Sequence, residues 1–171
     1  SYLSAGIIGY YDGVYSSGIN GQVGIDNTYG LIVGRYGDGV NINNIGGTPN
    51  EDGSWQAVDI NNTNGLIWGG EDGVDIYNAF GNTHIDNTSG TIFATGEYGA
   101  AISIIDTTDT HGVDGMGQAF VHIENAGGTI ESWWGNAIQV QGIYSYSEDG
   151  YGPNVQNGVV LIDNGEWTGS G

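Results

Sequence analysis

Short stretches in which Ile or Val alternates with polar residues recur along the chain. Each of these stretches ends in Ile, which is followed by an acidic or amide residue, then by Asn, and then by a short polar step. Such alternation predicts short β-strands with one buried face. Five segments share the pattern, at residues 23–28, 58–63, 83–88, 121–126 and 160–165.

Two further strand patterns follow each of the first four segments. A glycine precedes a short apolar strand, and a turn then leads into a third strand. The second strands are centred on Ile32, Ile67, Ile92 and Ile130, and the third strands cover residues 39–42, 73–76, 101–104 and 137–140. Residues 5–8 match the third-strand pattern, so we expect a third strand there too.

Three short strands per repeat, joined by Gly- and Asn-rich turns, predict the coils of a parallel β-solenoid rather than hairpins. We expect one all-β domain over residues 1–171, a solenoid of about five coils with long loop insertions. The coil motifs lie near residues 23–42, 58–76, 83–104, 121–140 and 160–171, and the insertions at 43–57, 107–119 and 141–158. Inward-facing residues of successive coils should stack in columns, one of them formed by Ile25, Ile60, Ile85, Ile123 and Ile162.

An asparagine recurs at the end of each first-strand segment. These residues are Asn27, Asn62, Asn87, Asn125 and Asn164. Stacked asparagines can donate their amides to carbonyl groups of the next coil, so the sequence predicts a structural Asn ladder. Asn also favours the left-handed turn conformation, and that interpretation stays open beside the first.

The repeats resemble those of bacterial autotransporter passenger domains and of large secreted adhesins. The resemblance is carried by residues 64–76, which read Asn-Gly-Leu-Ile-Trp-Gly-Gly-Glu-Asp-Gly-Val-Asp-Ile, and by residues 125–138. It covers nearly the whole chain and implies a right-handed parallel β-helix. Repeats of this kind scaffold adhesins, enzymes and passive surface fibres alike, so the resemblance points to architecture more than to activity. At 171 residues the chain is shorter than typical passengers.

Charge narrows the range of partners. The 171 residues (17.8 kDa) contain 20 acidic side chains and one basic residue, Arg35, for a net charge of −19. Nucleic acid is not expected as a partner because phosphate neutralisation needs Lys and Arg. No run of 18 apolar residues occurs, so no membrane span is expected. Arg35 is the one residue after which trypsin-like proteases could cleave the chain, and this resistance suits an extracellular or cell-surface location.

Several acidic residues are candidate calcium ligands. In the predicted register, Asp26, Asn61, Asp86, Glu124 and Asp163 share one outward column, about 4.8 Å apart. Their repulsion must be offset by bound cations or by solvation in salt. Residues 69–76 approach the calcium-binding nonapeptide but carry one residue too many, and ordinary Asp-Gly turn chemistry explains them equally. The candidate ligands are Asp26, Asp86, Glu124, Asp72 and Asp75.

A second possible metal site lies in another predicted column. Asp59, His84 and His122 fall at equivalent positions, where they could share a transition metal or coincide by register alone.

Aromatic residues are numerous, with 5 Trp, 11 Tyr and 3 Phe. Aromatics in loops are typical of contacts with sugars or with other protein chains, although some will cover the corners of the core. The candidate binding aromatics are Trp55, Trp133, Trp134, Tyr144 and Tyr146.

No catalytic signature is present, and we do not expect an enzyme. Lyase chemistry on acidic sugars needs a base, and Arg35 alone is available. Glycoside hydrolysis needs only a pair of carboxylates, and the chain contains many, so residue content alone does not exclude this chemistry. An ice-binding face would need regular Thr-x-Thr, which occurs only at residues 108–110, in an insertion. We expect a structural or adhesive surface protein, with a carbohydrate-binding or carbohydrate-cleaving β-helix as the alternative.

The two ends of the predicted solenoid lack caps. Solenoid ends expose unpaired strand edges, so isolated solenoids need capping segments, and residues 1 and 171 are flanked by none that we recognise. Residues 165–171 are expected to begin a second strand and residues 5–8 to form a third. The C-terminal segment of one copy and the N-terminal segment of the next copy would then complete one coil. We therefore expect head-to-tail stacking of copies into a filament, the alternative being an excerpt of a longer surface fibre.

Overall fold

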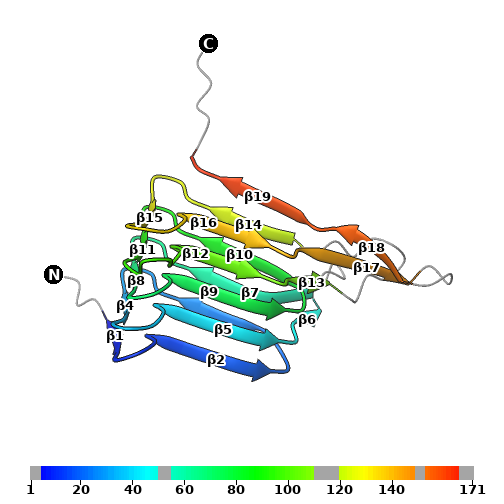
Figure 1. Cartoon of the computed structure of the whole chain (residues 1–171), viewed down its shortest axis with the longest axis horizontal. Coiled ribbons are helices and arrows are strands. Elements are labelled where there is room, and N and C mark those ends of the chain that lie inside the picture. The colour runs from blue at the N-terminus through cyan, green and yellow to red at the C-terminus, as the bar shows by residue number, and fades with distance from the viewer. Residues whose placement is uncertain (1–4, 50–54, 110–119, 149–152, 166–171) are drawn as a thin grey trace, which may run out of the picture.

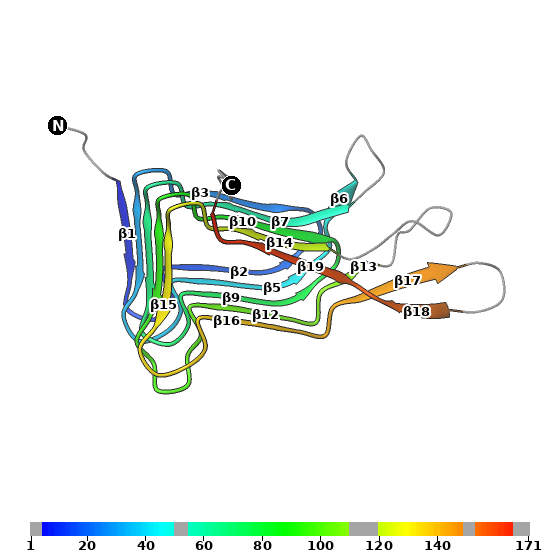
Figure 2. The same cartoon turned by 90° about the horizontal axis from the view of Figure 1, so that it is seen from above.

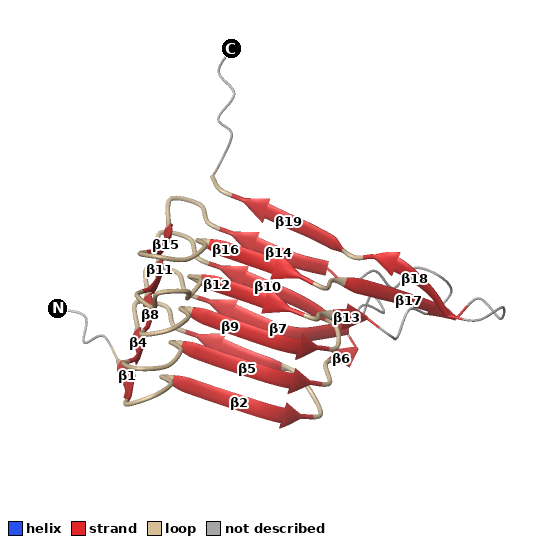
Figure 3. Cartoon of the chain, viewed as in Figure 1, coloured by secondary structure: helices blue, strands red, loops and turns tan. Residues whose placement is uncertain are grey.

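A computed structural model of the chain describes residues 5–49, 55–109, 120–148 and 153–165. Within these ranges the fold is all-β and contains no helix. Three parallel sheets, here called A, B and C, wind into a β-solenoid of five coils (Figures 1 and 3). Each coil contributes one strand to sheet A, then one to B, then one to C.

Sheet A has the shortest strands, which stack in the order of the coils. They are β1 (Gly6–Gly9), β4 (Leu31–Gly34), β8 (Leu66–Gly69), β11 (Thr91–Ala94) and β15 (Thr129–Ser132). Sheet B contains β2 (Val14–Ile19), β5 (Val40–Ile45), β9 (Val74–Ala79), β12 (Ile102–Ile105) and β16 (Ile138–Gln141).

Sheet C completes each coil. Its parallel strands are β3 (Val23–Asp26), β7 (Trp55–Asn61), β10 (Asn82–Asp86), β14 (Phe120–Glu124) and β19 (Val159–Asp163). Figure 2 shows sheets B and C running along each other while sheet A closes one end of the cross-section.

The insertions emerge between sheets B and C, at the end opposite sheet A (Figure 2). They carry β6 (Thr48–Pro49), which pairs antiparallel with β7, and β13 (Thr108–Asp109), which pairs parallel with β17 (Tyr144–Glu148). β17 and β18 (Pro153–Asn157) form an antiparallel hairpin. The first insertion is shorter than predicted, because β5 extends to Ile45 and β7 begins at Trp55.

The core consists of stacked aliphatic columns, as the repeat pattern predicts. Ile25, Ile60, Ile85, Ile123 and Ile162 pair in register along sheet C. Ile32, Ile67, Ile92 and Ile130 do so along sheet A, where Ile7 extends the column. In the three middle coils these side chains are fully buried. Burial of β-branched residues on every coil therefore holds the solenoid together.

The prediction for residues 5–8 is wrong. β1 pairs with β4, so it occupies sheet A and corresponds to a second strand rather than a third. The reason lies in the turn that follows: a Cβ at Gly9 would overlap the carbonyl oxygen of Asp12, as it would at Gly34 with Asp38. The shared coil expected from tail and head is therefore also wrong, and residues 166–171 lie outside the described ranges.

Candidate functional site

The five ladder asparagines form one continuous chain of hydrogen bonds. The Nδ2 of Asn27 donates to Oδ1 of Asn62, and this pattern continues through Asn87 and Asn125 to Asn164, each step at 2.7 Å. The Nδ2 groups of Asn27, Asn62 and Asn87 also donate to backbone carbonyls of the next coil, for example from Asn87 to Thr129 at 3.0 Å. The ladder has a direction, because every amide donates toward the C-terminal end.

The left-handed turn conformation lies elsewhere. Positive φ occurs two residues after the ladder, at Tyr29 (55°), Asn64 (54°), Ser89 (53°) and Gly127 (66°). The ladder asparagines are therefore required for their amides and not for backbone conformation.

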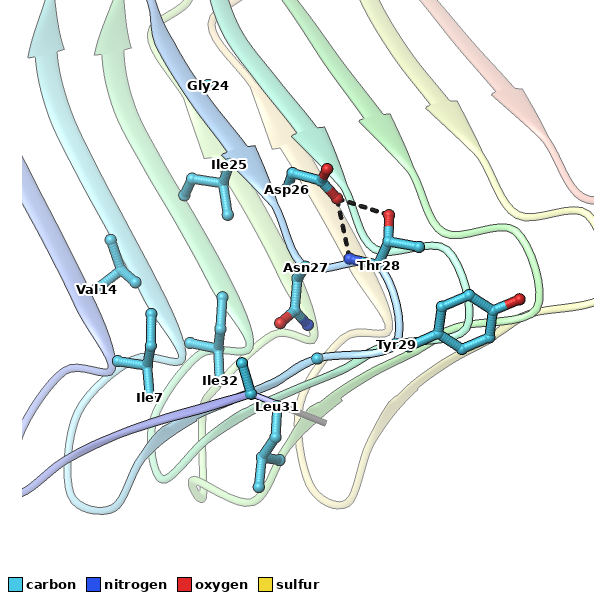
Figure 4. Close-up of a pocket in the computed structure, with 12 residues that line it drawn as sticks. Ile7, Val14, Gly24, Ile25, Asp26, Asn27, Thr28, Tyr29, Leu31 and Ile32 are labelled. Carbon is cyan, nitrogen blue, oxygen red and sulfur yellow. Dashed lines mark hydrogen bonds between the residues drawn. The ribbon is translucent and has the colours of Figure 1, made fainter. Parts of the chain in front are cut away.

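An acidic column runs along the outer edge of sheet C in the predicted register. Asp26, Asn61, Asp86, Glu124 and Asp163 are aligned by strand pairing. Asp26 accepts hydrogen bonds from the hydroxyl of Thr28 at 2.6 Å and from its backbone N–H at 3.0 Å (Figure 4). These bonds lower the pKa of Asp26, with the hydroxyl contributing most. The turn after Asp86 does the same, because Oδ1 of Asp86 accepts the backbone N–H of Thr88 at 2.8 Å.

A second acidic column, unforeseen in the sequence, lies in the turns between sheets A and B. Oδ1 of Asp12 accepts the backbone N–H of Asp38 at 2.9 Å, and Oδ1 of Asp38 accepts that of Asp72 at the same distance. Asp72 in turn accepts the N–H of Ala100. We call Asp12, Asp38 and Asp72 the aspartate stack.

Burial shifts the acid–base behaviour of this stack. Asp38 is only 6% exposed, and desolvation raises its pKa to about 7. The hydrogen bonds from Asp72 and Asn41 lower this pKa, whereas the negative charges of Asp72 and Asp75 raise it further. Desolvation likewise raises the pKa of Asp72 to about 6. The pKa of Asp75, on the adjoining strand β9, is raised for the same reason. Asp38 and Asp72 therefore keep their protons to a higher pH than an exposed aspartate does.

The candidate calcium ligands do not lie together in the structure. Asp26, Asp86 and Glu124 lie in the sheet C column, whereas Asp72 lies in the aspartate stack and Asp75 faces outward from sheet B. Among the described residues, no group of three or more His, Asp or Glu side chains is arranged to hold a metal ion.

The histidine column has the predicted register. His84 lies beside Asp59, with Nδ1 and Oδ1 3.0 Å apart, and its ring stacks at 5.2 Å on that of His122. Phe120 packs against His122 at 5.7 Å. The column is thus held by a hydrogen bond between His84 and Asp59 and by ring packing, which need no metal.

The candidate aromatics do not converge. Trp55 begins β7 and is partly buried, Tyr144 begins β17 and is 41% exposed, and Trp133 and Trp134 lie in the turn after β15. The side chain of Tyr146 lies outside the part of the chain that the structure describes.

The outward positions of sheet A are mainly apolar, which the sequence did not predict, and two of these side chains are exposed, Ile8 (58%) and Leu66 (36%). In β4, Ile32 belongs to the core while Val33 points the other way and is still only 6% exposed. We call this surface the sheet A outer face, and its apolar members are Ile8, Leu31, Val33, Leu66, Trp68 and Phe93. The corresponding outward positions of sheet B are mostly polar, Tyr15, Asn41, Asp75, Ser103 and Gln139.

Exposed rings line one margin of this face. We call them the aromatic rim, formed in the turns between sheets A and B by Tyr10, Tyr11, Tyr36, Tyr98, Trp133 and Trp134. Trp133 meets Phe93 edge to face, with ring centroids 5.4 Å apart, which joins rim and face. Tyr10 packs on Tyr36 at 4.8 Å, and a hollow of about 280 Å³ lies between Ile8, Tyr10 and Arg35.

The two ends of the solenoid leave the core open. At the N-terminal end a hollow of about 510 Å³ is lined by Ile7, Val14, Ile25 and Ile32, whose side chains point into it (Figure 4). At the other end Ile162 is 47% exposed, although its partners in the middle coils are fully buried. Described side chains thus leave both end coils uncovered.

Within the described ranges, no helix has the length and hydropathy needed to cross a membrane. Comparison of the chain with protein-family models, with curated proteins and with solved structures found no match, so its assignment rests on its architecture, that of a parallel β-solenoid.

Proposed function

We propose that the chain is an extracellular structural or adhesive protein that stacks head to tail through its two open ends. The observation that carries the proposal is the match between these ends. β1, β2 and β3 form one end and β15, β16 and β19 the other, in the same order of sheets A, B and C. Because every inter-coil pairing in these sheets is parallel, the free edges of one end complement those of the other.

A second copy placed one coil step above the first continues every column. Its β1 would pair with β15, its β2 with β16 and its β3 with β19. Ile7 would then cover Ile130, and Ile25 would cover Ile162, as their equivalents do inside the chain. The junction would bury apolar side chains that now lie half exposed at both ends.

The Asn ladder gives the junction a direction. The Nδ2 group of Asn164 has no acceptor among the described residues, and Oδ1 of Asn27 likewise has no donor there. Head-to-tail stacking brings this donor to that acceptor. Contacts of this heterologous kind do not close on themselves, and they generate a filament.

Charge opposes the same junction. Asp163 of one copy would stack near Asp26 of the next, at the spacing of about 4.8 Å between strands. With a net charge of −19 per copy, assembly should therefore need salt to screen the repulsion.

An outside location is supported by the composition and by the resemblance of the repeats to those of secreted adhesins. A surface fibre is exposed to proteases, and the full sequence offers trypsin-like enzymes only Arg35.

A matched set of variants tests the stacking. Ile162 and Leu161 are neighbours in β19 with almost equal exposure (47% and 46%), yet Ile162 continues the core column and Leu161 faces out. We expect the chain to form filaments at about 0.5 M salt, I162E to abolish them and L161E to leave them intact. Electron microscopy and sedimentation velocity provide the readout.

Mixing two blocked variants sharpens the test. I7E spoils the N-terminal end and I162E the C-terminal end, so each alone should stay monomeric, whereas their mixture should form 1:1 dimers through the one intact pair of ends. A chain that stays monomeric at all salt concentrations would contradict the proposal, as would filaments that tolerate I162E.

A further inference from the structure

We propose that the sheet A outer face, with its aromatic rim, binds a linear uncharged polysaccharide. This goes beyond the head-to-tail stacking, because the face runs along the side of the solenoid and takes no part in the end junctions. It is the one side of the described coils where outward strand positions are mainly apolar.

The apolar character of the face is extensive and ordered. Outward positions run in register from Ile8 through Val33 and Trp68 to Phe93, one per coil. Leu31 and Leu66 flank them in the neighbouring column. Ile8 and Leu66 are exposed on this face, beside the exposed rings of the aromatic rim, and a gathering of exposed apolar side chains of this kind marks an interaction site, unlike single exposed hydrophobic residues.

The rings and their surroundings favour a sugar. Apolar C–H faces of pyranose rings pack on aromatic rings, and their hydroxyl groups need hydrogen-bonding partners beside those rings. Both are present here: Tyr10, Tyr36 and Trp133 are more than half exposed, while Glu131 and Thr129 face outward in the last coil. A lipid surface would need no such polar groups along the face.

The geometry favours a polymer over a small ligand. Equivalent positions recur with every coil, about 4.8 Å apart along the solenoid axis, so the contacts lie along a line. The hollow beside Ile8, Tyr10 and Arg35 is an open one of about 280 Å³ and does not enclose a ligand. An extended chain can contact several coils at once and gain from each.

Charge selects an uncharged chain. The sequence has one basic residue and a net charge of −19, so polyuronates, sulfated glycans and anionic membranes are repelled. The carboxylate of Glu131 can accept a hydrogen bond from a neutral sugar hydroxyl group, whereas it repels an anionic sugar.

The test uses the full chain carrying I162E, so that binding is measured on a monomer and its outcome does not depend on filament formation. Hydroxyethyl cellulose, galactomannan and amylose are the probes, with polygalacturonate as the anionic control. Binding is followed by tryptophan fluorescence and by affinity electrophoresis. We expect at least one neutral probe to bind and polygalacturonate not to bind.

Ring-deletion variants locate the site. W133A and Y36A should each weaken binding about tenfold, since both rings are more than 60% exposed and their loss leaves the core unchanged. Y77A is the matched control, because Tyr77 is an exposed ring (46%) on strand β9 of sheet B. Circular dichroism establishes that each variant is folded.

Three results would overturn the proposal: no neutral probe binds the folded chain, binding persists unchanged in both W133A and Y36A, or Y77A weakens it equally. Trp133-dependent flotation with neutral lipid vesicles, or Trp133-dependent lateral dimers of the I162E chain, would assign the face to a membrane or to a second copy instead.

Discussion

Replacing Asp38 by Asn tests how the buried aspartate stack controls stability. Asp38 is 6% exposed and its pKa is raised to about 7 from a usual value of 3.8. A carboxyl whose pKa is higher in the folded state binds its proton more tightly there. Its stabilising effect is therefore complete below about pH 4, is lost progressively as the pH rises from about 4 to about 7, and is absent above that.

The magnitude follows from the two pKa values. Each tenfold change in proton affinity is worth about 1.36 kcal/mol, so the change from 3.8 to about 7 corresponds to about 4 kcal/mol for Asp38. This figure is a ceiling, because the charges of Asp72 and Asp75 contribute to the shift and titrate with it. The chain should thus be markedly more stable at about pH 5 than at about pH 8.5.

Asn at position 38 keeps the contacts of the protonated acid. Its Oδ1 can still accept the N–H of Asp72, and its amide donor replaces the acid proton beside Asn41. We expect D38N to be closest in stability to the original chain at about pH 4, to exceed it increasingly toward about pH 8.5, and to show a flatter pH profile between them.

Urea unfolding followed by circular dichroism across this pH range provides the assay. D26N is the control, because Asp26 is exposed and its pKa is lowered by Thr28. The contribution of Asp26 to stability is present at neutral pH and is lost on acidification. D26N should therefore still lose stability as the pH rises from about 5 to about 8.5, as the original chain does. Equal stability of the original chain at the two pH values, or an unchanged slope in D38N, would refute the reasoning.

Other features give separate predictions, each measured as the free energy of unfolding. The buried hydroxyl of Thr83 has no hydrogen-bond partner in the described structure and lies in a column of valines, so T83V should stabilise by about 1–2 kcal/mol, and a loss would show a hidden partner. N87A removes the middle of the Asn ladder and should cost about 3 kcal/mol or more, while a cost below about 1 kcal/mol would make the ladder incidental. G69A places a Cβ on the carbonyl oxygen of Asp72 and should destabilise by about 1–3 kcal/mol; a neutral effect would mean that the turn can move. Raising salt from about 0.01 M to about 1 M should increase stability by screening the acidic columns, and an unchanged midpoint would show them fully solvated.

The strand columns and the ladder could be predicted because a solenoid repeats its chemistry on every coil. Each of Ile60, Ile85 and Ile123 is followed two residues later by a ladder asparagine, so stacking any two coils aligns both. Local alternation and the repeat then point to one register.

β1 was misplaced because four residues rich in Gly and Ile fit two strand types equally well. The turn held the better signal: Gly9-Tyr-Tyr-Asp12-Gly13-Val14 corresponds to Gly69-Gly-Glu-Asp72-Gly73-Val74, which joins sheet A to sheet B. The Asp-Gly-Val sequence that ends this turn also marks the aspartate stack, since it occurs at Asp12, Asp38 and Asp72.

The sheet A outer face escaped prediction for a different reason. Both faces of β4 and β8 are apolar, so the alternation that separates inside from outside is absent there. Nor does any local pattern report that Asp38 is buried, since its cover comes from neighbouring coils.

The graded exposure of the sheet C column has a consequence for how the chain opens. Ile60, Ile85 and Ile123 have a neighbour on both sides and are fully buried, whereas Ile162 has one neighbour and is 47% exposed. Each end coil is thus held by a single interface, and opening should proceed by fraying inward from the two ends. Backbone amides of β8, β9 and β10 should then exchange with deuterated solvent most slowly. The amide protection of each coil would then depend on its distance from the nearer end of the solenoid, with the middle coils protected most.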